Sequence, residues 1–380
     1  MAGSKLRHLR DGALLTLLAV ALLILAEAGI RGLRWMTGGP TSTRVERLYA
    51  TLDQTLGLYR PHPFLNTAPR SGAAVEAFGK SATFNSLGYR SPERPMSKAP
   101  GTVRILCAGG STTFDLLAAS DEETWPWLLE AALSAAGERV EVWNAGFPGW
   151  TSVENLISLA VRDADLQPDV VLLFQGINDL QPASHRPFDR QYVEGHAEVS
   201  RRALGLDRQP LAWTERSLLL EAARDAIFGA EDPWDRVRAA AEAGGRRGEL
   251  APEAAEVFAR NVRSFVALVR GHGGIPVLAT QVLRLRAATE PQGREYLAGW
   301  LAGLDPGAAP AALEVLNDVF RRVAEEDEVL LVDAAGELEW RDEHFADPMH
   351  FSAAGSRQLA ELVASRLAPV LKDRRSETSG

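Results

Sequence analysis

The sequence predicts an α/β protein in which a five-stranded, mostly parallel sheet lies between two layers of helices, a three-layer α/β/α arrangement. Two observations predict this class. Five short apolar runs alternate with stretches that carry apolar residues at helical spacing. Each run is continuously apolar, which is typical of parallel strands that are buried on both faces. With 380 residues, 46 % of them hydrophobic, the chain is long enough for one large domain with additional segments.

The strands are predicted at residues 103–107, 140–143, 170–174, 276–280 and 329–333. Amphipathic helices are predicted around residues 128–133, 153–161, 258–269, 313–323 and 359–370. A charged insert rich in Ala and Arg, residues 185–250, interrupts this alternation. We expect it to form helices above the strand ends, joined by mobile Gly-rich connections.

The first thirty residues predict export. Basic residues precede an uncharged apolar stretch, residues 13–26, and Arg31 and Arg34 follow it. A signal peptide would end at the small-x-small site formed by residues 26–28. A membrane anchor of about 20 residues would extend from residue 9 to residue 30, including Glu27. An anchor would leave the N-terminus in the cytoplasm, because basic residues favour that side.

The sequence therefore divides into four parts. Residues 1–36 form a cytoplasmic tip and transmembrane anchor, or a signal peptide. Residues 37–100 have dense turn signals and are expected to be an extended connecting segment packed on the domain. Residues 101–372 form the α/β domain with its insert, and residues 373–380 are expected to be a disordered tail.

Composition excludes some functions. The net charge of −9 argues against a nucleic-acid partner, which requires a basic surface. Cys107 is the single cysteine, so the chain makes no internal disulfide.

Polar residues follow the carboxyl ends of the predicted strands, where the active sites of such sheets form. The first strand leads to Gly109-Gly110-Ser111, the second to NAGFPGWTS (144–152), the third to FQGINDL (174–180) and the last to HFADPMHFSAAG (344–355).

Each of these segments has a structural explanation when it is taken alone. Ser111 or Thr112 could cap a helix, and a glycine-serine loop could hold a phosphate. Asn144 and Asn178 could be turn formers, and Asp347 or Ser352 could be a helix cap. Asp347 and His350 could also be two metal ligands, but the strand ends carry no His or Cys cluster that would complete the site.

Taken together, the segments predict acyl transfer. Ser111 is the candidate nucleophile, and His350 is the base that it needs within hydrogen-bond reach. Asp347 can accept from the other imidazole nitrogen and stabilise the imidazolium. The backbone N–H groups of Ser111 and Gly149 and the side-chain amide of Asn178 are candidate donors to the oxyanion.

The chain resembles the SGNH hydrolase family, also called GDSL-type esterases, whose four signature blocks carry Ser, Gly, Asn and His. The blocks GGST (109–112), NAGFPG (144–149), GIND (176–179) and DPMH (347–350) occur in the family's order within residues 103–371. The resemblance implies a flavodoxin-like fold for residues 101–372. It gives Ser111 the role of nucleophile, Gly149 and Asn178 oxyanion roles, and Asp347 and His350 the Asp-x-x-His pair.

Three details qualify the resemblance. Gly146 is a second candidate in its block, although the spacing from Asn144 favours Gly149. The acidic residue that usually precedes the serine is Gly110 here. The G-x-S-x-G elbow of other hydrolases is not matched, because Thr113 stands at its last position.

The N-terminal part resembles a bacterial membrane-anchored subgroup of the family. That subgroup has a membrane segment with Glu and then Arg, followed by NSLGYR before the serine block. Glu27, Arg31 and residues 85–90 match this pattern, which favours the anchor.

The sequence thus predicts an exported serine esterase that hydrolyses carboxylic esters through an acyl-enzyme. Its substrates would include O-acetyl groups on a surface or secreted glycan. A glycan O-acetyltransferase would need the same five residues, and an inactive glycan-binding scaffold is the alternative outside catalysis. The expected partners are the ester or acylated glycan and, through the N-terminal helix, the membrane. No cofactor or metal is expected, and the sequence does not indicate an oligomeric state.

Overall fold

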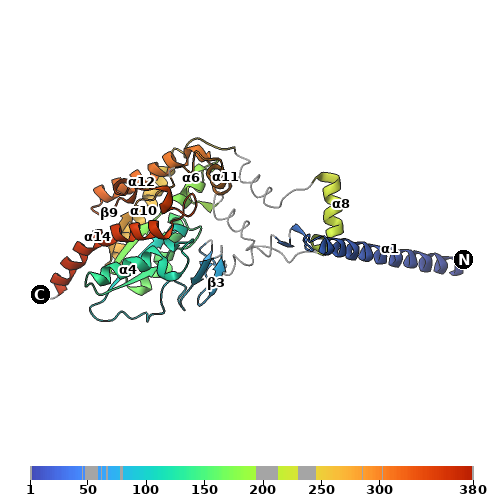
Figure 1. Cartoon of the computed structure of the whole chain (residues 1–380), viewed down its shortest axis with the longest axis horizontal. Helices are drawn as coiled ribbons and strands as arrows, with labels where there is room; N and C mark the ends of the chain where they lie inside the picture. The colour runs from blue at the N-terminus through green and yellow to red at the C-terminus, as the bar shows by residue number, and fades with distance from the viewer. Residues whose placement is uncertain are drawn as a thin grey trace. The chain divides into compact units, whose positions relative to one another are not determined.

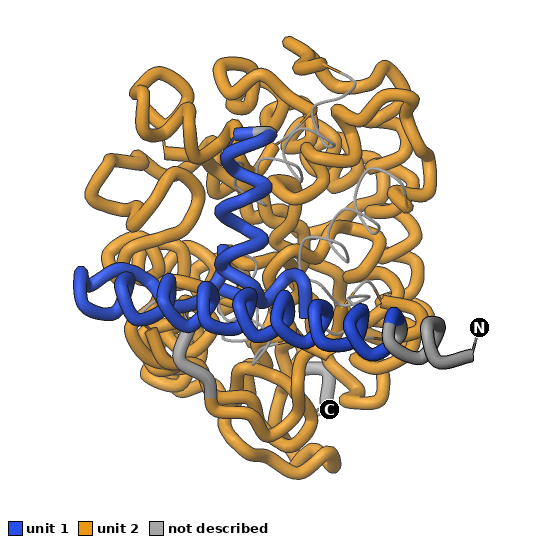
Figure 2. Tube along the Cα trace, turned by 90° about the vertical axis from the view of Figure 1, so that its right-hand side faces the viewer, with its two compact units in different colours: residues 1–54, 207–237 blue, residues 55–206, 238–380 orange. Residues whose placement is uncertain are grey.

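The chain forms two compact units in the computed structural model, which describes residues 2–44, 46–47, 59–60, 62–65, 67–77, 80–193, 213–229, 245–284, 286–301 and 303–378. The first unit comprises residues 1–54 and 207–237, and the second comprises residues 55–206 and 238–380 (Figure 2). The second unit contains all the predicted site residues.

The first unit is built on one long helix, α1 (Ala2–Met36). Its stretch from Arg10 to Met36 has 27 residues, a mean hydropathy of 2.5 in its most apolar window, and no buried residue in that window. At about 1.5 Å per residue this stretch exceeds the roughly 30 Å of a bilayer core. Length and composition of this kind are shared by membrane spans and signal sequences.

A helix from the predicted insert completes the first unit. The short helix η5 (Trp213–Arg216) leads into α8 (Leu218–Phe228), which packs on α1. The sequence predicts helices in this insert but gives no sign that one of them contacts the N-terminal helix.

The second unit contains the predicted parallel sheet. Its strands are β5 (Val103–Gly109), β6 (Val140–Asn144), β7 (Val170–Phe174), β8 (Ile275–Ala279) and β9 (Leu330–Val332). All neighbouring strands are parallel, in the order β6-β5-β7-β8-β9. This order confirms the predicted fold class, and it places β5 between β6 and β7, so that their three carboxyl ends meet.

Helices cover both faces of the sheet, as predicted (Figure 1). α4 (Trp125–Ala135) and α14 (Ala353–Thr378) pack together on one face, where Ile105 and Cys107 point. α5 (Ser152–Val161), α10 (Ala254–Gly271) and α12 (Ala309–Glu326) cover the other face, where Leu106 and Ala108 point. Successive residues of a strand point to opposite faces, so a continuously apolar strand serves both cores.

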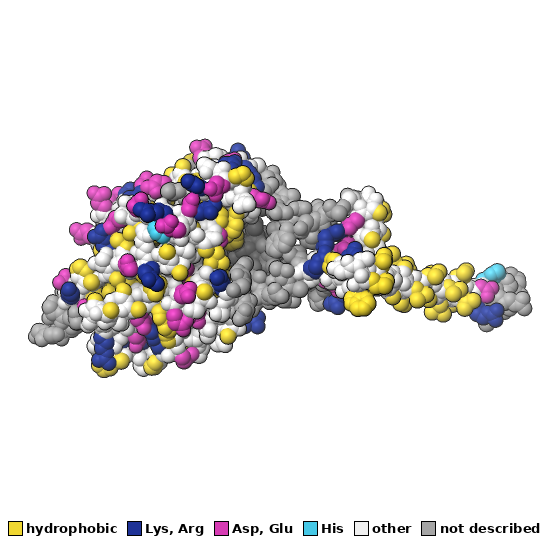
Figure 3. All heavy atoms as spheres, in the orientation of Figure 1, with side chains coloured by type: hydrophobic (Ala, Val, Ile, Leu, Met, Phe, Trp, Pro, Cys, Tyr) yellow, Lys and Arg dark blue, Asp and Glu magenta, His cyan; other side chains and the backbone are white. Residues whose placement is uncertain are grey.

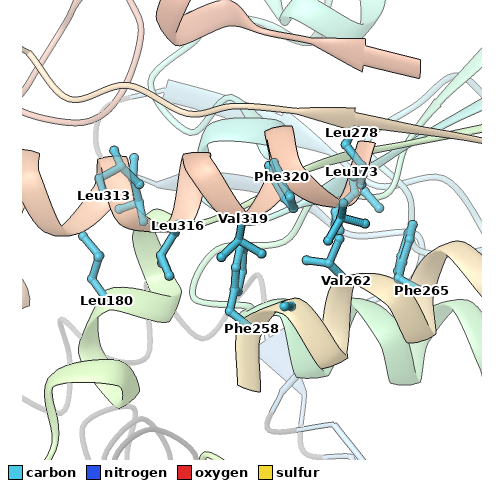
Figure 4. Packing of buried hydrophobic residues seen from close by; sticks show 14 of the residues in the cluster. Leu173, Leu180, Phe258, Val262, Phe265, Leu278, Leu313, Leu316, Val319 and Phe320 are labelled. Carbon is cyan, nitrogen blue, oxygen red and sulfur yellow. The ribbon is translucent and has the colours of Figure 1, made fainter. Parts of the chain in front are cut away.

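The larger of the two cores lies between α10, α12 and the sheet (Figure 4). The rings of Phe258 on α10 and Phe320 on α12 lie 5.3 Å apart between these helices. The helical spacing of their apolar residues in the sequence is the direct cause of this packing.

The prediction of a disordered tail is wrong for residues 373–378, because α14 continues to Thr378. Leu371 is fully buried, and Arg374 one turn later donates a hydrogen bond to Asp169. These contacts extend the helix beyond its apolar pattern. Residues 379–380 lie outside the described part.

Short antiparallel ladders form in the segment before the domain, β1 (Tyr59–Arg60) with β2 (Ala68–Pro69) and β3 (Ala74–Ala77) with β4 (Lys80–Thr83). Its side chains join an apolar cluster with Phe114, the last residue of α3 (Ser111–Phe114), and with Phe147 and Trp150 in the loop after β6. The Trp150 indole N–H also donates to the carbonyl of Thr67. This segment therefore supports the loops that carry the candidate site.

Candidate active site

Ser111 begins the short helix α3 (Ser111–Phe114) at the carboxyl end of β5. The residue that caps this helix is Gly110, and no side chain caps it, so Ser111 is not a helix cap here. A side chain on Gly109 would stand 2.0 Å from Thr113 Oγ1 and 2.2 Å from the Phe174 carbonyl oxygen. Only glycine fits there, and the chain can therefore turn directly into α3.

His350 and Asp347 complete a hydrogen-bonded chain with this serine. His350 Nε2 lies 2.8 Å from Ser111 Oγ, and His350 Nδ1 lies 2.7 Å from Asp347 Oδ2. Ser111 and His350 are both buried, with exposed fractions of 5 % and 4 %. With Asp347 ionised, Nδ1 carries the imidazole hydrogen, and Nε2 is left to accept from the serine hydroxyl.

Asp347 is held in its charged form. Burial opposes ionisation, but hydrogen bonds from His350 and from the backbone N–H groups of Met349 and His350 outweigh it, so the pKa of Asp347 lies below its usual value. Asp347 is not the cap of α14, which begins six residues later. Its two oxygens thus fix both the local turn and the imidazole.

Tyr296 also contacts Asp347, and no pattern in the sequence predicted this contact. This tyrosine lies on α11 (Pro291–Trp300), a helix that the sequence did not predict because its apolar residues show little periodicity. The Tyr296 hydroxyl donates a 3.0 Å hydrogen bond to Asp347 Oδ2, the oxygen that also contacts His350.

Two backbone N–H groups near the serine have no hydrogen-bond acceptor among the described residues, those of Ser111 and Gly149. Gly149 has φ +85°, which favours glycine, and a Cβ added there would meet nothing within 4 Å. The space beside its α-carbon is therefore open.

Gly146, the other glycine of this block, is engaged in packing. Its N–H donates to the Asn144 side chain at 3.1 Å, and a Cβ would stand 2.4 Å from the backbone nitrogen of Phe114. The Asn144 side chain thus forms the turn, as its structural explanation predicts, and the N–H of Gly146 is already used.

The Asn178 amide lies close to the serine loop. Its Nδ2 donates to the Trp150 carbonyl at 2.8 Å, which leaves one amide hydrogen without a described acceptor. The Gln175 amide donates to the same carbonyl at 3.0 Å and to Asp179 at 2.7 Å. Asp179 also accepts from Ser152, and burial raises its pKa to about 6 against these hydrogen bonds. This buried network fixes the loop that carries Asn178.

Gln281 is a second residue that the sequence reasoning missed. It follows β8, and its Nε2 donates to Thr112 Oγ1 at 2.7 Å while its Oε1 accepts from the Ile177 N–H at 2.7 Å. It therefore joins the serine loop to the Asn178 loop. Its place at the carboxyl end of the fourth strand was the available signal.

A metal site at Asp347 and His350 would need further ligands. No group of three or more His, Cys, Asp or Glu side chains that could hold a metal ion occurs within the described ranges. The two side chains contact each other instead.

Comparison with known proteins gives a matching family. The GDSL-like lipase/acylhydrolase family matches residues 107–358. No protein of curated function matches the chain.

Solved structures also match. A lipase/acylhydrolase from Enterococcus faecalis is 19 % identical, with a TM-score of 0.41, over 70 % of this chain and 95 % of that one. An acetyl-xylooligosaccharide esterase from Geobacillus is 16 % identical, with a TM-score of 0.41, over 70 % and 94 %. An acetyl xylan esterase is 14 % identical, with a TM-score of 0.37, over 69 % and 98 %.

Proposed function

This chain belongs to the GDSL-like lipase/acylhydrolase family and is an ester-hydrolysing enzyme, and we propose that it cleaves carboxylic esters through an acyl-enzyme on Ser111. The observation that carries the assignment is the hydrogen-bonded chain from Ser111 through His350 to Asp347. A nucleophile, a base and a group that orients the base are the components that nucleophilic acyl transfer requires.

The proposed reaction has two halves. Ser111 Oγ attacks the acyl carbon while His350 Nε2 takes the hydroxyl proton, and Asp347 stabilises the resulting imidazolium. The oxyanion receives hydrogen bonds from the N–H groups of Ser111 and Gly149 and from the Asn178 amide. Collapse breaks the ester bond, and His350 returns the proton to the departing alcohol. Water then attacks the acyl-enzyme with the same base and donors, which releases the acid and Ser111.

Labelling with a fluorophosphonate tests this assignment. The full-length protein should be labelled and should hydrolyse p-nitrophenyl acetate, and Ser111→Ala should lose both properties with an unchanged melting temperature. Ser134→Ala, at an exposed position on α4, is the matched control and should keep both. More than trace activity in Ser111→Ala would remove the serine from the nucleophile role.

We also propose that the substrates are O-acetyl groups on a surface or secreted glycan. The support is the apolar N-terminal helix. As an anchor or a signal sequence it would direct the domain out of the cytoplasm, to the side of the membrane where such glycans lie. Acetate release from acetylated glycans, compared with release of longer acyl chains from lipid esters, tests the substrate class. The same incubation with an unacetylated glycan acceptor separates hydrolysis from O-acetyl transfer, and absence of both reactions would favour the glycan-binding scaffold.

We further propose that α1 is retained as a single-pass anchor with an extracytoplasmic catalytic unit. The Glu27 carboxylate accepts hydrogen bonds at 2.8–3.0 Å from the Ser217 hydroxyl and the N–H groups of Leu218 and Leu219. Arg31 joins Glu27 to the carbonyls of Thr41 and Arg216. Cleavage after residue 28 would remove the carboxylate that caps α8.

Membrane fractionation and the mass of the mature N-terminus test the anchor. The retained chain should resist extraction by carbonate and high salt and should keep Glu27. A mature chain that begins near residue 29 would contradict it.

A further inference from the structure

Helix α8 turns its charged side toward the rest of the first unit. Glu221 lies 3.8 Å from the Arg34 guanidinium and accepts from the Arg44 N–H at 2.6 Å. Asp225, one turn later, pairs with the Arg44 guanidinium at 2.5 Å. Leu218, on the same side of the helix, is fully buried. The ion pairs of α8 therefore hold it against α1 and the segment that follows.

The opposite side of α8 is apolar and exposed. Leu220 and Ile227 have exposed fractions of 39 % and 71 %, and Ala223 is also exposed. Positions 220, 223 and 227 lie at i, i+3 and i+7 and so form one stripe along the helix. Trp213, in the η5 turn just before α8, is 78 % exposed. This arrangement is the reverse of a helix on a water-soluble surface, which turns its apolar side inward.

The position of α8 along α1 indicates what covers this stripe. Glu27, which caps α8, lies at the end of the uncharged stretch of α1, where the hydrocarbon core would give way to the headgroups. Figures 1 and 2 both show α8 running across the direction of α1. Figure 3 shows hydrophobic side chains along α1 up to this region. A helix that lies across a membrane-spanning helix at this level lies along the bilayer surface.

We propose that α8 is an interfacial helix, with Leu220, Ala223, Ile227 and Trp213 inserted among the lipid headgroups and upper acyl chains. Tryptophan is enriched at this depth, and amphipathic helices bury their apolar side there. This proposal rests on the proposed anchor and goes beyond it. The chain passes between the two units near residues 54, 206 and 237. A membrane-bound α8 would therefore tether the second unit through the two connections of the insert as well as through the one that follows α1.

Cysteine labelling of the full-length protein tests the proposal. The single native cysteine, Cys107, is fully buried and should not react. An environment-sensitive fluorophore is attached to two variants in the stripe, Leu220→Cys and Ile227→Cys. It is also attached to Arg224→Cys, at the charged edge of the stripe. The protein is reconstituted in vesicles of phosphatidylcholine and phosphatidylglycerol that contain a lipid with a nitroxide near the headgroup. Leu18→Cys on α1 reports the anchor, and Glu361→Cys on α14 reports a water-exposed site.

The lipid nitroxide should quench most of the fluorescence at positions 220 and 227, less at 224, and none at 361. If a probe at position 18 is shielded in the bilayer while 220 and 227 stay open to iodide in water, the interfacial helix is wrong and the anchor stands. Protection of 220 and 227 from both quenchers would mean that protein covers the stripe, which also overturns the proposal. Iodide access at position 18 would overturn the anchor itself and, with it, the interfacial helix.

Discussion

The side-chain nitrogen of Asn178 lies 2.4 Å from the point where a Cβ atom would stand on Gly110. The acidic residue that usually precedes the serine in this family therefore cannot be accommodated unless the amide moves. The backbone of Gly110 is extended, with φ −90° and ψ −150°, a conformation open to any residue. Glycine at position 110 is therefore needed because it leaves room for the Asn178 amide. The backbone conformation at this position does not require glycine.

Gly110→Asp, which restores the family's usual residue type, should lower kcat. A displaced Asn178 amide would remove one of the proposed oxyanion donors, so we expect a loss on the order of 10²-fold, with Gly110→Ala showing the same direction. Gly271→Ala, at a helix end where a Cβ meets nothing within 4 Å, is the control and should be neutral. Ester hydrolysis by the three purified variants gives the comparison.

A double-mutant cycle tests the coupling directly. In an Asn178→Ala background, Gly110→Ala should cost little further activity, because the group it displaces is absent. Fully additive losses would show that Gly110 acts independently of Asn178.

Asn178→Ala should itself lower kcat by roughly 10²–10³ with little change in KM, because the amide would stabilise charge that exists only in the transition state. A residue that only formed the turn would give another pattern, a loss of stability on the order of 1 kcal/mol with normal turnover. Steady-state kinetics and the melting temperature, measured on the same preparation, distinguish these outcomes.

Tyr296→Phe tests the fourth hydrogen bond to Asp347. The hydroxyl donates one neutral hydrogen bond to a carboxylate that keeps three other donors, so kcat should fall only about 5-fold, which corresponds to ~1 kcal/mol. Asp347→Asn should cost far more, because it favours the wrong imidazole tautomer.

The pH dependence separates a positioning role for Tyr296 from a structural one. Loss of the hydroxyl should shift the acidic limb of the kcat/KM profile to higher pH, because a carboxylate with one donor fewer stabilises the imidazolium more strongly. A variant with an unchanged pH profile and reduced stability would mean that Tyr296 only packs α11.

Much of the fold and site was predictable from local sequence. Continuous apolar strands predicted the parallel sheet, and the residues that end its strands predicted where Ser111, Asn178 and His350 would meet. Gln281 follows the fourth strand but was missed because the predicted acyl transfer assigned no role to it. Tyr296 was missed because it lies on α11, which the sequence did not predict. The contact of Glu27 with α8 was missed because no pattern in the sequence pairs Glu27 with Ser217, 190 residues later.

The contribution of Asp115, a buried acid behind the serine helix, to stability should fall as pH rises from about 4 to about 6. Burial raises the pKa of Asp115 to about 6, although hydrogen bonds from Ser356 and the Trp125 N–H and the charge of Arg90 oppose this. A raised pKa in the folded state means that the folded protein binds more protons than the unfolded chain within this interval. The stability that protonated Asp115 contributes is therefore fully present below about pH 4 and is lost as Asp115 ionises.

Asp115→Asn isolates this contribution. Its amide oxygen can accept from Trp125 and Ser356 as the acid does, and its NH₂ replaces the Asp115 oxygen that has no partner among the described residues. Relative to wild type, the variant should gain on the order of 2–3 kcal/mol between pH 4 and pH 7, since a shift of about two pKa units corresponds to that energy. The stability of the variant should still depend on pH in this range, because Asp179 has a similarly raised pKa. Melting temperatures across this pH range, with Glu361→Gln as an exposed control, measure the difference, and parallel curves for Asp115→Asn and wild type would show that Asp115 is already ionised at pH 4.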